Sequence, residues 1–485
     1  MIHYKAIYKI LGVLLLAEAC VLLCCGLIPL FCRESDLFAF ICSALCTACG
    51  AMVFLTFGKG AKKQLTRRDG YIVVSFSWIF FSLFGALPYV ISGVFNSYID
   101  AFFETMAGFT TTGGTIIRNV EVIPCGILFW RSLTQWIGGL GIIFFTVAVL
   151  PLFGVGGDVQ LFAAEAVGPT RAKIHPRIEV SGRWILFIYL LLTGAAAVVY
   201  FACGMSFFDA VNHALTTLAS GGFSTKNASI GAYNSPTLEM FVILFMFLSG
   251  VNFPLIYFLL FNGKVKQLFS DSEFKFYFMT IIVASVVIGI GVSLTSGLPV
   301  FASLRTALFH VVAIVTTTGF STTNFTLWHP AFVMILGLLM YFGACSGSTS
   351  GSMKSIRIVL LFKLLRNEFH RILHPNAIKP VKINNHSISS SISQSIMAFT
   401  VFYIIMVFVG WLVFIILGLS MSDAYAATVS LIGNIGVATN GLGDTLSWNM
   451  LSPVAKLFAS AVMLVGRLEI FPILLLFSRG FWNKN

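Results

Sequence analysis

Long apolar runs, separated by short polar or glycine-rich stretches, make up most of this chain of 485 residues. A helix needs about 20 mostly apolar residues to cross a bilayer. Lipid offers no partners to backbone amides and carbonyls, so such runs are expected to be helical. We therefore predict an all-α polytopic membrane protein with ten spans near residues 7–31, 37–57, 71–93, 126–151, 183–204, 237–261, 274–296, 328–342 with a continuation to about 372, 395–419 and 453–478.

A second pattern recurs four times between these spans. A polar residue followed by alanine opens a short apolar stretch, and a glycine stands 13 residues after the polar residue. The stretch between them offers about ten helical residues, too few to span a bilayer, so we expect a re-entrant helix with the polar residue as its N-cap. The polar residues are Asp100, Asp209, Thr306 and Asp423, and the glycines are Gly113, Gly222, Gly319 and Gly436.

The pattern recurs every 97 to 117 residues, which indicates a larger repeated unit. We predict an amino-terminal two-helix hairpin at 1–60 and four helix–pore-loop–helix units at 61–160, 161–265, 266–385 and 386–485. Non-helical backbone at membrane depth is tolerated only where protein or a water-filled cavity surrounds it. Four loops that converge on one pore would satisfy this condition for one another.

The loops have the composition of a cation filter. Glycine permits the backbone angles that turn carbonyls toward an axis, and rings of such carbonyls replace the hydration shell of an ion. One such glycine per loop predicts a short stack of ion sites. The candidate filter residues are Thr110, Thr111, Thr112, Gly113, Ala219, Ser220, Gly221, Gly222, Thr316, Thr317, Thr318, Gly319, Gly433, Asn434, Ile435 and Gly436. Behind them, Glu104, His213 and His310 are expected to hydrogen-bond to the loops rather than to sense protons.

Composition and charge support this class and suggest an orientation. The chain is 58% hydrophobic and 10% charged, with a formal net charge of +12. Placing the amino terminus inside puts 23 of the 30 Lys and Arg on that side, so we predict that both termini are cytoplasmic and that the glycine loops face outward. The basic residues are dispersed over six short segments, which argues against nucleic-acid binding. Seven of the ten cysteines lie in the first hairpin, and we interpret them as packing residues rather than a metal or disulfide framework.

The loop motifs resemble those of a known family. The sequences TTTGGT at 110–115, SGGFST at 220–225, TTTGFST at 316–322 and NIG at 434–436 are similar to the Trk/Ktr/HKT superfamily of potassium transporters, closest to bacterial TrkH membrane subunits, over essentially the whole chain. The resemblance implies an inner-membrane homodimer with one potassium pathway per subunit and a cytoplasmic TrkA-like nucleotide-binding ring as regulator. It also implies preference for potassium over sodium, because the first filter glycine, Gly113, is not serine.

One span is interrupted by polar residues. Residues 343–353 read GACSGSTSGSM, and the helical pattern resumes only as a basic run that is too charged to span. We expect this interrupting segment to lie inside the membrane and to obstruct the pathway, although an ordinary loop is the alternative. Arg467 stands 31 residues after Gly436, and the same offset from Gly319 in the third unit reaches Ser350 of the segment. We therefore predict that the Arg467 guanidinium donates to carbonyls of the segment. The alternative is that the side chain snorkels to the membrane interface. The candidate gate residues are Gly343, Ser346, Gly347, Ser348, Thr349, Ser350, Gly351 and Arg467.

The expected function is potassium uptake through a channel-like pore, with the potassium ion as the transported species. A proton- or sodium-coupled potassium symporter is the alternative. The sequence shows no arrangement typical of intramembrane catalysis, so no enzyme activity is predicted. Gly-Val-Gly-Gly at 154–157 does not follow a predicted strand, so no nucleotide site is expected in this chain and nucleotide sensing would need a partner.

Overall fold

The computed structural model describes residues 2–32, 34, 36–61, 65–149, 178–375, 380–384, 386–437 and 448–483. The glycine run at 154–157 and part of the predicted boundary between the first and second units lie outside these residues. Within them the chain is helical apart from one two-stranded antiparallel hairpin, in which Lys382 pairs with Ser387 and Ile383 with His386.

We describe the elements in the groups predicted from the sequence, one hairpin and four units. The hairpin comprises α1 (Tyr4–Cys25), α2 (Leu27–Cys32) and α3 (Leu37–Phe57). The first unit holds α4 (Arg67–Gly85), α5 (Leu87–Ile91), α6 (Tyr98–Phe109), η1 (Val120–Val122) and α7 (Cys125–Val149). The second holds α9 (Ile178–Ala202), α10 (Phe207–Leu218), η3 (Ser229–Tyr233), α11 (Pro236–Ser249), α12 (Phe253–Asn262) and α13 (Val265–Ser270).

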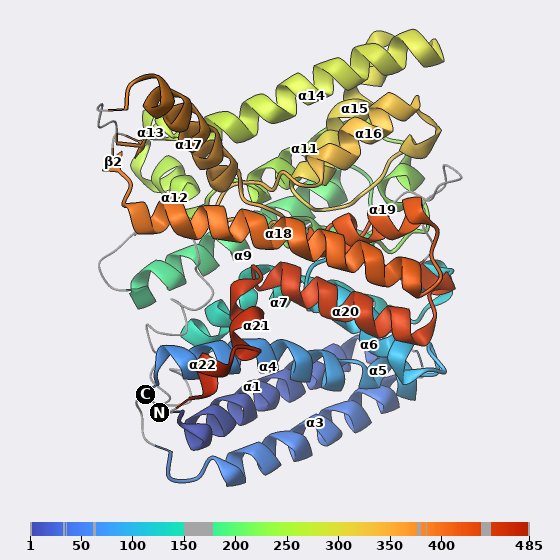
Figure 1. Cartoon of the computed structure of the whole chain (residues 1–485). Coiled ribbons are helices and arrows are strands. Elements are labelled where there is room, and N and C mark those ends of the chain that lie inside the picture. Colours follow the sequence, from blue (N-terminus) through green and yellow to red (C-terminus); the bar gives the residue numbers. More distant parts are fainter. Residues whose placement is uncertain are drawn as a thin grey trace.

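The third unit holds α14 (Ser272–Ser296), α15 (Val300–Val315), η4 (Phe325–Leu327), α16 (Pro330–Leu339), α17 (Ser355–Leu373), β1 (Lys382–Ile383) and β2 (His386–Ser387). The fourth holds α18 (Ser390–Ile416), α19 (Met421–Ile432), η5 (Trp448–Met450), α20 (Pro453–Arg467), α21 (Phe471–Leu476) and α22 (Arg479–Trp482). In Figure 1 the long helices run from one end of the molecule to the other, and both termini lie at the end that also carries α12, α13 and β2.

Among the described residues, six helical segments are long and apolar enough to cross a membrane, and α11 with α12 forms a further candidate span bent by 106°. These segments correspond to the predicted spans that begin near 7, 37, 71, 183, 237, 274 and 395. The other three predicted spans differ from simple crossings. The run at 126–151 contains α7 with a non-helical residue, the run at 328–342 holds a helix of only 10 residues, and the run at 453–478 is divided between α20 and α21.

The second long helix is therefore interrupted in all four units, whereas the sequence pattern predicted an interruption only in the third. In α7 the break is at Gly141 (φ 74°, ψ 152°), and in the fourth unit Glu469 and Ile470 take positive φ values of 54° and 67°. Proline follows two of the breaks, at Pro254 and Pro472, where the missing N–H is tolerated in the first turn of the next helix.

The four short helices, α6, α10, α15 and α19, begin earlier than predicted. The predicted N-caps Asp100, Asp209 and Asp423 lie inside the first turn, because a serine three residues earlier starts each helix. The hydroxyls of Ser206 and Ser420 accept hydrogen bonds from the amides of Asp209 and Asp423 at 3.1 and 3.2 Å. The aspartates are instead suited to the positive end of the helix dipole. The predicted cap Thr306 is also inside its helix, since α15 begins at Val300.

Candidate functional site

Each short helix runs into a loop with the same unusual backbone geometry. We call these the glycine loops 1 to 4, residues 110–113, 219–222, 316–319 and 433–436. The glycine that ends each loop has φ between 75° and 78°, and the polar residue two positions earlier has φ between 52° and 59°. These left-handed residues are Thr111 and Gly113, Ser220 and Gly222, Thr317 and Gly319, and Asn434 and Gly436. Alternation of right- and left-handed angles turns successive carbonyls to the same side of a chain.

The four loops form a closed ring of backbone contacts. A Cβ built on each terminal glycine would overlap the carbonyl oxygen of the residue before the glycine in the next loop. The overlapping oxygens belong to Gly221 for Gly113, Thr318 for Gly222, Ile435 for Gly319 and Thr112 for Gly436. Glycine is thus required at these positions both for its left-handed angle and because no side chain fits between adjacent loops. The cyclic order of contacts shows that the loops surround a common axis.

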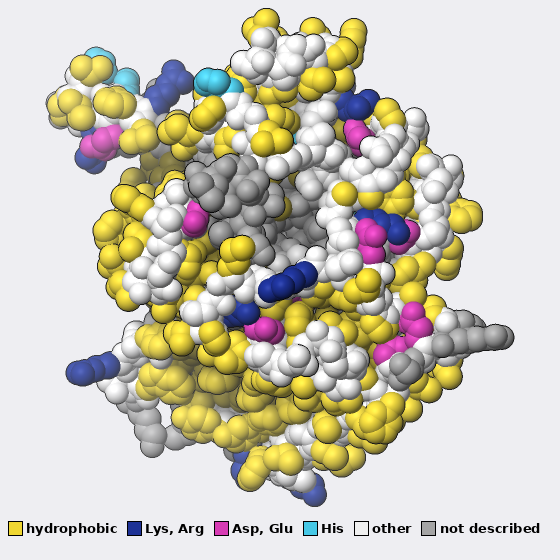
Figure 2. All heavy atoms as spheres, turned by 90° about the vertical axis from the view of Figure 1, so that its right-hand side faces the viewer, with side chains coloured by type: hydrophobic (Ala, Val, Ile, Leu, Met, Phe, Trp, Pro, Cys, Tyr) yellow, Lys and Arg dark blue, Asp and Glu magenta, His cyan; other side chains and the backbone are white. Residues whose placement is uncertain are grey.

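The face of the molecule nearest these loops is recessed at its middle. Figure 2 views the molecule from the end opposite the termini and shows a hollow bordered largely by white atoms, which are backbone and uncharged polar groups. Two ion pairs each link a short helix to a neighbouring helix. Lys456 contacts Asp100 at 2.7 Å, and Arg305 contacts Glu239 at 2.7 Å. Among the described residues, the border of the recess therefore consists mostly of backbone and uncharged groups.

Threonine hydroxyls in the loops bond to their own helices. Thr110 Oγ1 donates to Met106 O at 2.6 Å and lies 2.7 Å from Thr112 Oγ1. Thr316 and Thr318 repeat this arrangement in loop 3, with Thr316 Oγ1 2.8 Å from Thr318 Oγ1. These four hydroxyls stabilise the turn, so they are engaged within their own loops and helices.

Side chains from neighbouring elements support loops 2 and 4. Gln135 of α7 donates from Nε2 to Gly221 O at 2.7 Å and accepts from Phe223 N at 3.0 Å, which pins both sides of the glycine that ends loop 2. Asn434 donates from Nδ2 to Thr112 Oγ1 at 3.0 Å, and the indole of Trp448 donates to Gly436 O at 2.9 Å. Loop 4 lacks hydroxyls, and its amide side chain provides the corresponding link to loop 1.

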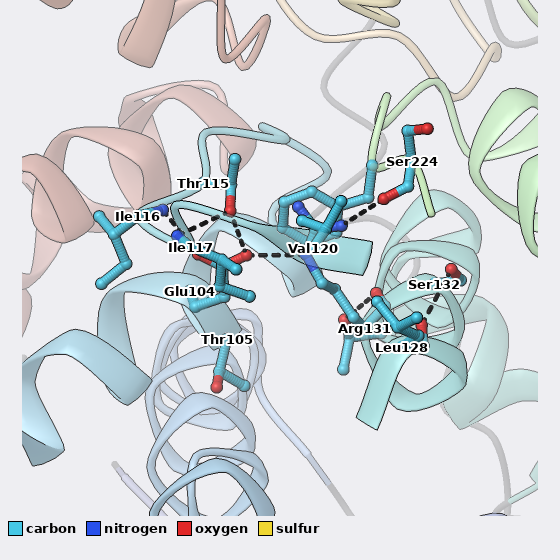
Figure 3. A network of polar contacts seen from close by, with 12 residues as sticks. Glu104, Thr105, Thr115, Ile116, Ile117, Val120, Leu128, Arg131, Ser132 and Ser224 are labelled. Atoms are coloured by element: carbon cyan, nitrogen blue, oxygen red, sulfur yellow. Dashed lines mark hydrogen bonds and ion pairs between the residues drawn. The ribbon is translucent and has the colours of Figure 1, made fainter. Parts of the chain in front are cut away.

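A buried ion pair ties loop 1 to loop 2 from behind. Arg131 Nε lies 2.8 Å from Glu104 Oε1, and the two side chains are 3% and 0% exposed. Glu104 also accepts from Thr115 Oγ1 at 2.8 Å and from Ile116 N at 2.9 Å, as Figure 3 shows. Arg131 donates to Ser224 O at 2.9 Å. The pair therefore holds the chain just after each of the two loops.

The two histidines of the short helices have a similar supporting position. His213 lies between Asp209 O at 2.8 Å and Ser224 Oγ at 2.9 Å. His310 Nε2 is 3.3 Å from Thr323 Oγ1, four residues after the glycine of loop 3. Both rings are buried and contact the chain after a glycine loop, which is the structural role expected from the sequence.

The interrupting segment, residues 343–353, lies directly against glycine loops 2, 3 and 4. Thr349 Oγ1 is 2.6 Å from Ser220 Oγ, and Gly351 N donates to Thr317 Oγ1 at 2.7 Å. A Cβ on Gly351 would overlap the carbonyl oxygen of Gly433. The segment thus contacts the left-handed residues of loops 2 and 3 and the backbone of loop 4.

The segment is also fixed to the interruption of the second unit. Cys345 N donates to Gly250 O at 3.0 Å, and Phe253 N donates to Gly347 O at 3.2 Å. Gly347 has a φ of 74° and packs against Asn252. The breaks of two helices thereby satisfy each other's exposed amides and carbonyls, as non-helical backbone in a membrane requires.

Arg467 joins the interrupting segment to α7. Its guanidinium donates from Nη1 to Thr349 O at 2.9 Å and from Nη2 to Gly138 O at 2.5 Å. The structure thus places the guanidinium of Arg467 against a carbonyl of the segment. Glu469, two residues later, pairs with Arg357 of α17 instead of with Arg467. The remaining candidate gate residues, Gly343, Ser346, Ser348 and Ser350, lie in the same segment, where Ser348 Oγ is 2.9 Å from Ser350 Oγ.

Sequence reasoning missed three features of this site. In each loop, the left-handed residue two positions before the glycine is a Thr, Ser or Asn, so the sequence carried no sign of its backbone conformation. Gln135 could have been noticed as an uncharged polar residue within the apolar run at 126–151. Glu273, which accepts hydrogen bonds from Ser346 N at 2.5 Å and Ser346 Oγ at 2.8 Å, stands next to the start of a predicted span and gave no pattern.

Comparison with known proteins gives consistent matches along the whole chain. A family model described as "TrkH: Cation transport protein" matches residues 38–484. The chain is 36% identical over 490 residues to the Trk system potassium uptake protein TrkH of Escherichia coli K12, which covers 99% of this chain and 100% of that protein. It is 33% identical to the potassium uptake protein TrkG of the same organism, covering 99% of this chain and 99% of that protein.

A solved structure has the same fold. The crystal structure of the potassium transporter TrkH from Vibrio parahaemolyticus superposes with a TM-score of 0.89 at 31% sequence identity. The match covers 99% of this chain and 100% of that chain. The similarity therefore includes the amino-terminal hairpin as well as the four units.

Proposed function

This chain belongs to the TrkH family of cation transport proteins, and we propose that it is the multi-pass inner-membrane subunit of a potassium uptake system. Potassium passes along the axis of the four glycine loops and enters the cell under the membrane potential, which contributes about 2.3 kcal/mol per charge for each 100 mV. The ion is the transported species, and the chain itself performs no catalysis.

The closed ring of backbone contacts among the glycine loops carries this proposal. An alkali cation loses its hydration shell only where oxygens replace the lost water, and carbonyl rings at a common axis supply them. Four loops that touch in cyclic order hold such carbonyls in place. The filter consists of the four loops at 110–113, 219–222, 316–319 and 433–436, and Gly113 in the first of them favours potassium over sodium.

The interrupting segment and Arg467 form the gate of this pathway. The segment contacts three of the four loops, and the hydrogen bond from Arg467 to Thr349 O holds it there. The positive charge of the guanidinium beside the segment also disfavours a cation. Opening requires the segment to move away from the loops, which breaks the contact of Arg467 with Thr349 O but keeps its hydrogen bond to Gly138 O of α7.

Regulation comes from the end of the molecule that holds both termini, which we assign to the cytoplasm. The interrupting segment continues directly into α17, whose outer half carries Lys363, Arg366 and Arg371. A basic helix continuous with the gate is a suitable docking site for a TrkA-like nucleotide-binding ring. The membrane subunit functions as a homodimer with one pathway in each copy.

Competitive uptake into liposomes tests the proposal. Purified protein is reconstituted with potassium inside, and uptake of labelled rubidium is measured against external potassium or sodium, with and without a pH gradient. We expect potassium to compete strongly and sodium weakly, with uptake independent of the pH gradient. Equal competition by sodium contradicts the filter assignment, and uptake that requires the pH gradient shows proton-coupled symport instead.

A further inference from the structure

Glu273 holds the interrupting segment at Ser346, a different residue from the one that Arg467 contacts. This carboxylate lies in the first turn of α14 and is 3% exposed. It accepts hydrogen bonds from Ser346 N at 2.5 Å and Ser346 Oγ at 2.8 Å, both from the start of the segment. It also accepts from Ile356 N at 3.1 Å, in the first turn of α17. One carboxylate therefore joins both the segment and the start of α17 to α14.

The start of α14 is in turn bonded to the β1–β2 hairpin. Asp271, the N-cap of α14, accepts at Oδ1 from the amides of Glu273 and Phe274, each at 2.9 Å. Its other oxygen accepts from Asn384 Nδ2 at 2.5 Å, and Asn384 Oδ1 accepts from Ser272 N at 2.9 Å. This reciprocal pair fixes the turn of the hairpin to the residues that immediately precede Glu273.

The hairpin lies at the surface, at the end of the molecule that holds both termini (Figure 1). It is attached to α17 as well, because Lys363 Nζ donates to Lys382 O at 2.8 Å and Ile383 packs in a small cluster with Ile356, Leu360 and Ile396. A force on the hairpin or on α17 thus reaches the first turn of α14 through hydrogen bonds that involve Asn384.

We infer that Glu273 is a latch for the interrupting segment, and that Asn384 in the exposed hairpin sets the position of this latch. The inference rests on the proposed role of the segment as a gate and identifies residues that regulate it. When the hairpin moves, Asp271 and the first turn of α14 move with it, and Glu273 loses its bonds to Ser346. Glu273 and Asn384 are positioning residues, since neither lies in the glycine loops.

Uptake by the full chain in liposomes without any partner tests the latch. Glu273→Ala should raise rubidium uptake about tenfold or more, because the change removes all three hydrogen bonds that the carboxyl group accepts, which together contribute at least the free energy that changes an equilibrium tenfold. Glu273→Gln should give an intermediate increase, since its amide oxygen still accepts from the amides of Ser346 and Ile356. Asn384→Asp should raise uptake several-fold because a second carboxylate would face Asp271.

The matched control is Asn262→Asp, which adds the same charge at the exposed end of α12 and should leave uptake unchanged. All variants should keep the wild-type preference for potassium over sodium, which a damaged filter would not do. The latch is refuted if folded Glu273→Ala conducts no more than wild type, if the preference changes, or if Asn384→Asp matches Asn262→Asp. Gly113→Ser tests the pore through ion preference without involving Glu273, so failure of the latch and failure of the pore are distinguishable.

Discussion

Replacing Arg467 with alanine should open the pathway in the absence of any partner. In the structure this side chain connects a carbonyl of the interrupting segment, Thr349 O, to a carbonyl of α7, Gly138 O. Of the two bonds that Arg467 makes here, the one to Thr349 O involves the segment. Movement of the segment must therefore break this bond, whereas the bond to Gly138 O can stay. Removing the guanidinium eliminates this cost of opening while the glycine loops keep their own contacts.

The size of the effect follows from the kind of bond that is lost. A hydrogen bond with a charged donor contributes about 1.5–3 kcal/mol, and each 1.4 kcal/mol changes an equilibrium by a factor of about ten. The open population, and with it basal rubidium uptake, should therefore rise about ten- to hundredfold in Arg467→Ala. Deletion of 346–350 removes Thr349 and should also raise uptake. The two changes together should be far from additive, because they eliminate the same contact.

Arg467→Lys separates the hydrogen bond from the charge. Lysine keeps the positive charge but lacks the planar fork that reaches two carbonyls at once. If the hydrogen bond controls opening, Arg467→Lys should show a clear part of the increase. If the charge alone repels cations, it should behave as wild type. Size-exclusion profile and thermal unfolding confirm that each variant is folded, and a folded Arg467→Ala protein with uptake at or below the wild-type level refutes the assignment.

Three further changes test the filter and its support. Gly113→Ser should increase sodium uptake relative to potassium, because its Cβ would displace the carbonyl of the next loop; an unchanged competition profile argues against a filter there. Gly222→Ala should likewise disturb ion preference, whereas Gly93→Ala, at the same φ of 78° but with open space around it, should cost only about 1–2 kcal/mol of stability. Arg131→Met leaves Glu104 buried without its counter-charge and should lower unfolding stability by about 3–5 kcal/mol; thermal unfolding close to the wild-type temperature contradicts this.

Features with a direct chemical requirement were predictable from sequence. A glycine is the residue that fits where the next loop's carbonyl lies against the Cα atom, so Gly113 and its three counterparts stand at one offset. The apolar runs indicated most spans for a similar reason, because lipid excludes unpaired backbone groups. The link between Arg467 and the interrupting segment was foreseen from its distance to the preceding glycine.

Other features depend on tertiary contacts that leave little trace in the residue pattern. Thr111 and Thr317 adopt left-handed angles that threonine does not favour by itself, and the amide after each bonds back to its own short helix, at Ala107 O and Ala313 O. The break at Gly141 lies within an apolar run, so hydropathy passes over it. Serine caps three residues before each aspartate were overlooked because the polar–Ala pair was taken as the helix start. Glu273 is an isolated carboxylate, whose partners only the fold brings near.

The backbone contact between adjacent glycine loops has a consequence for how the four quarters of this protein can diverge. Each glycine loop contacts the carbonyl of the next loop, so a substitution at such a contact needs a compensating substitution in the adjacent unit. Side chains can differ where a compensating contact exists, as at Asn434, whose amide donates to Thr112 of loop 1 although loop 4 lacks hydroxyls. A lineage of such proteins should therefore vary its loop side chains separately but its terminal glycines only as a set.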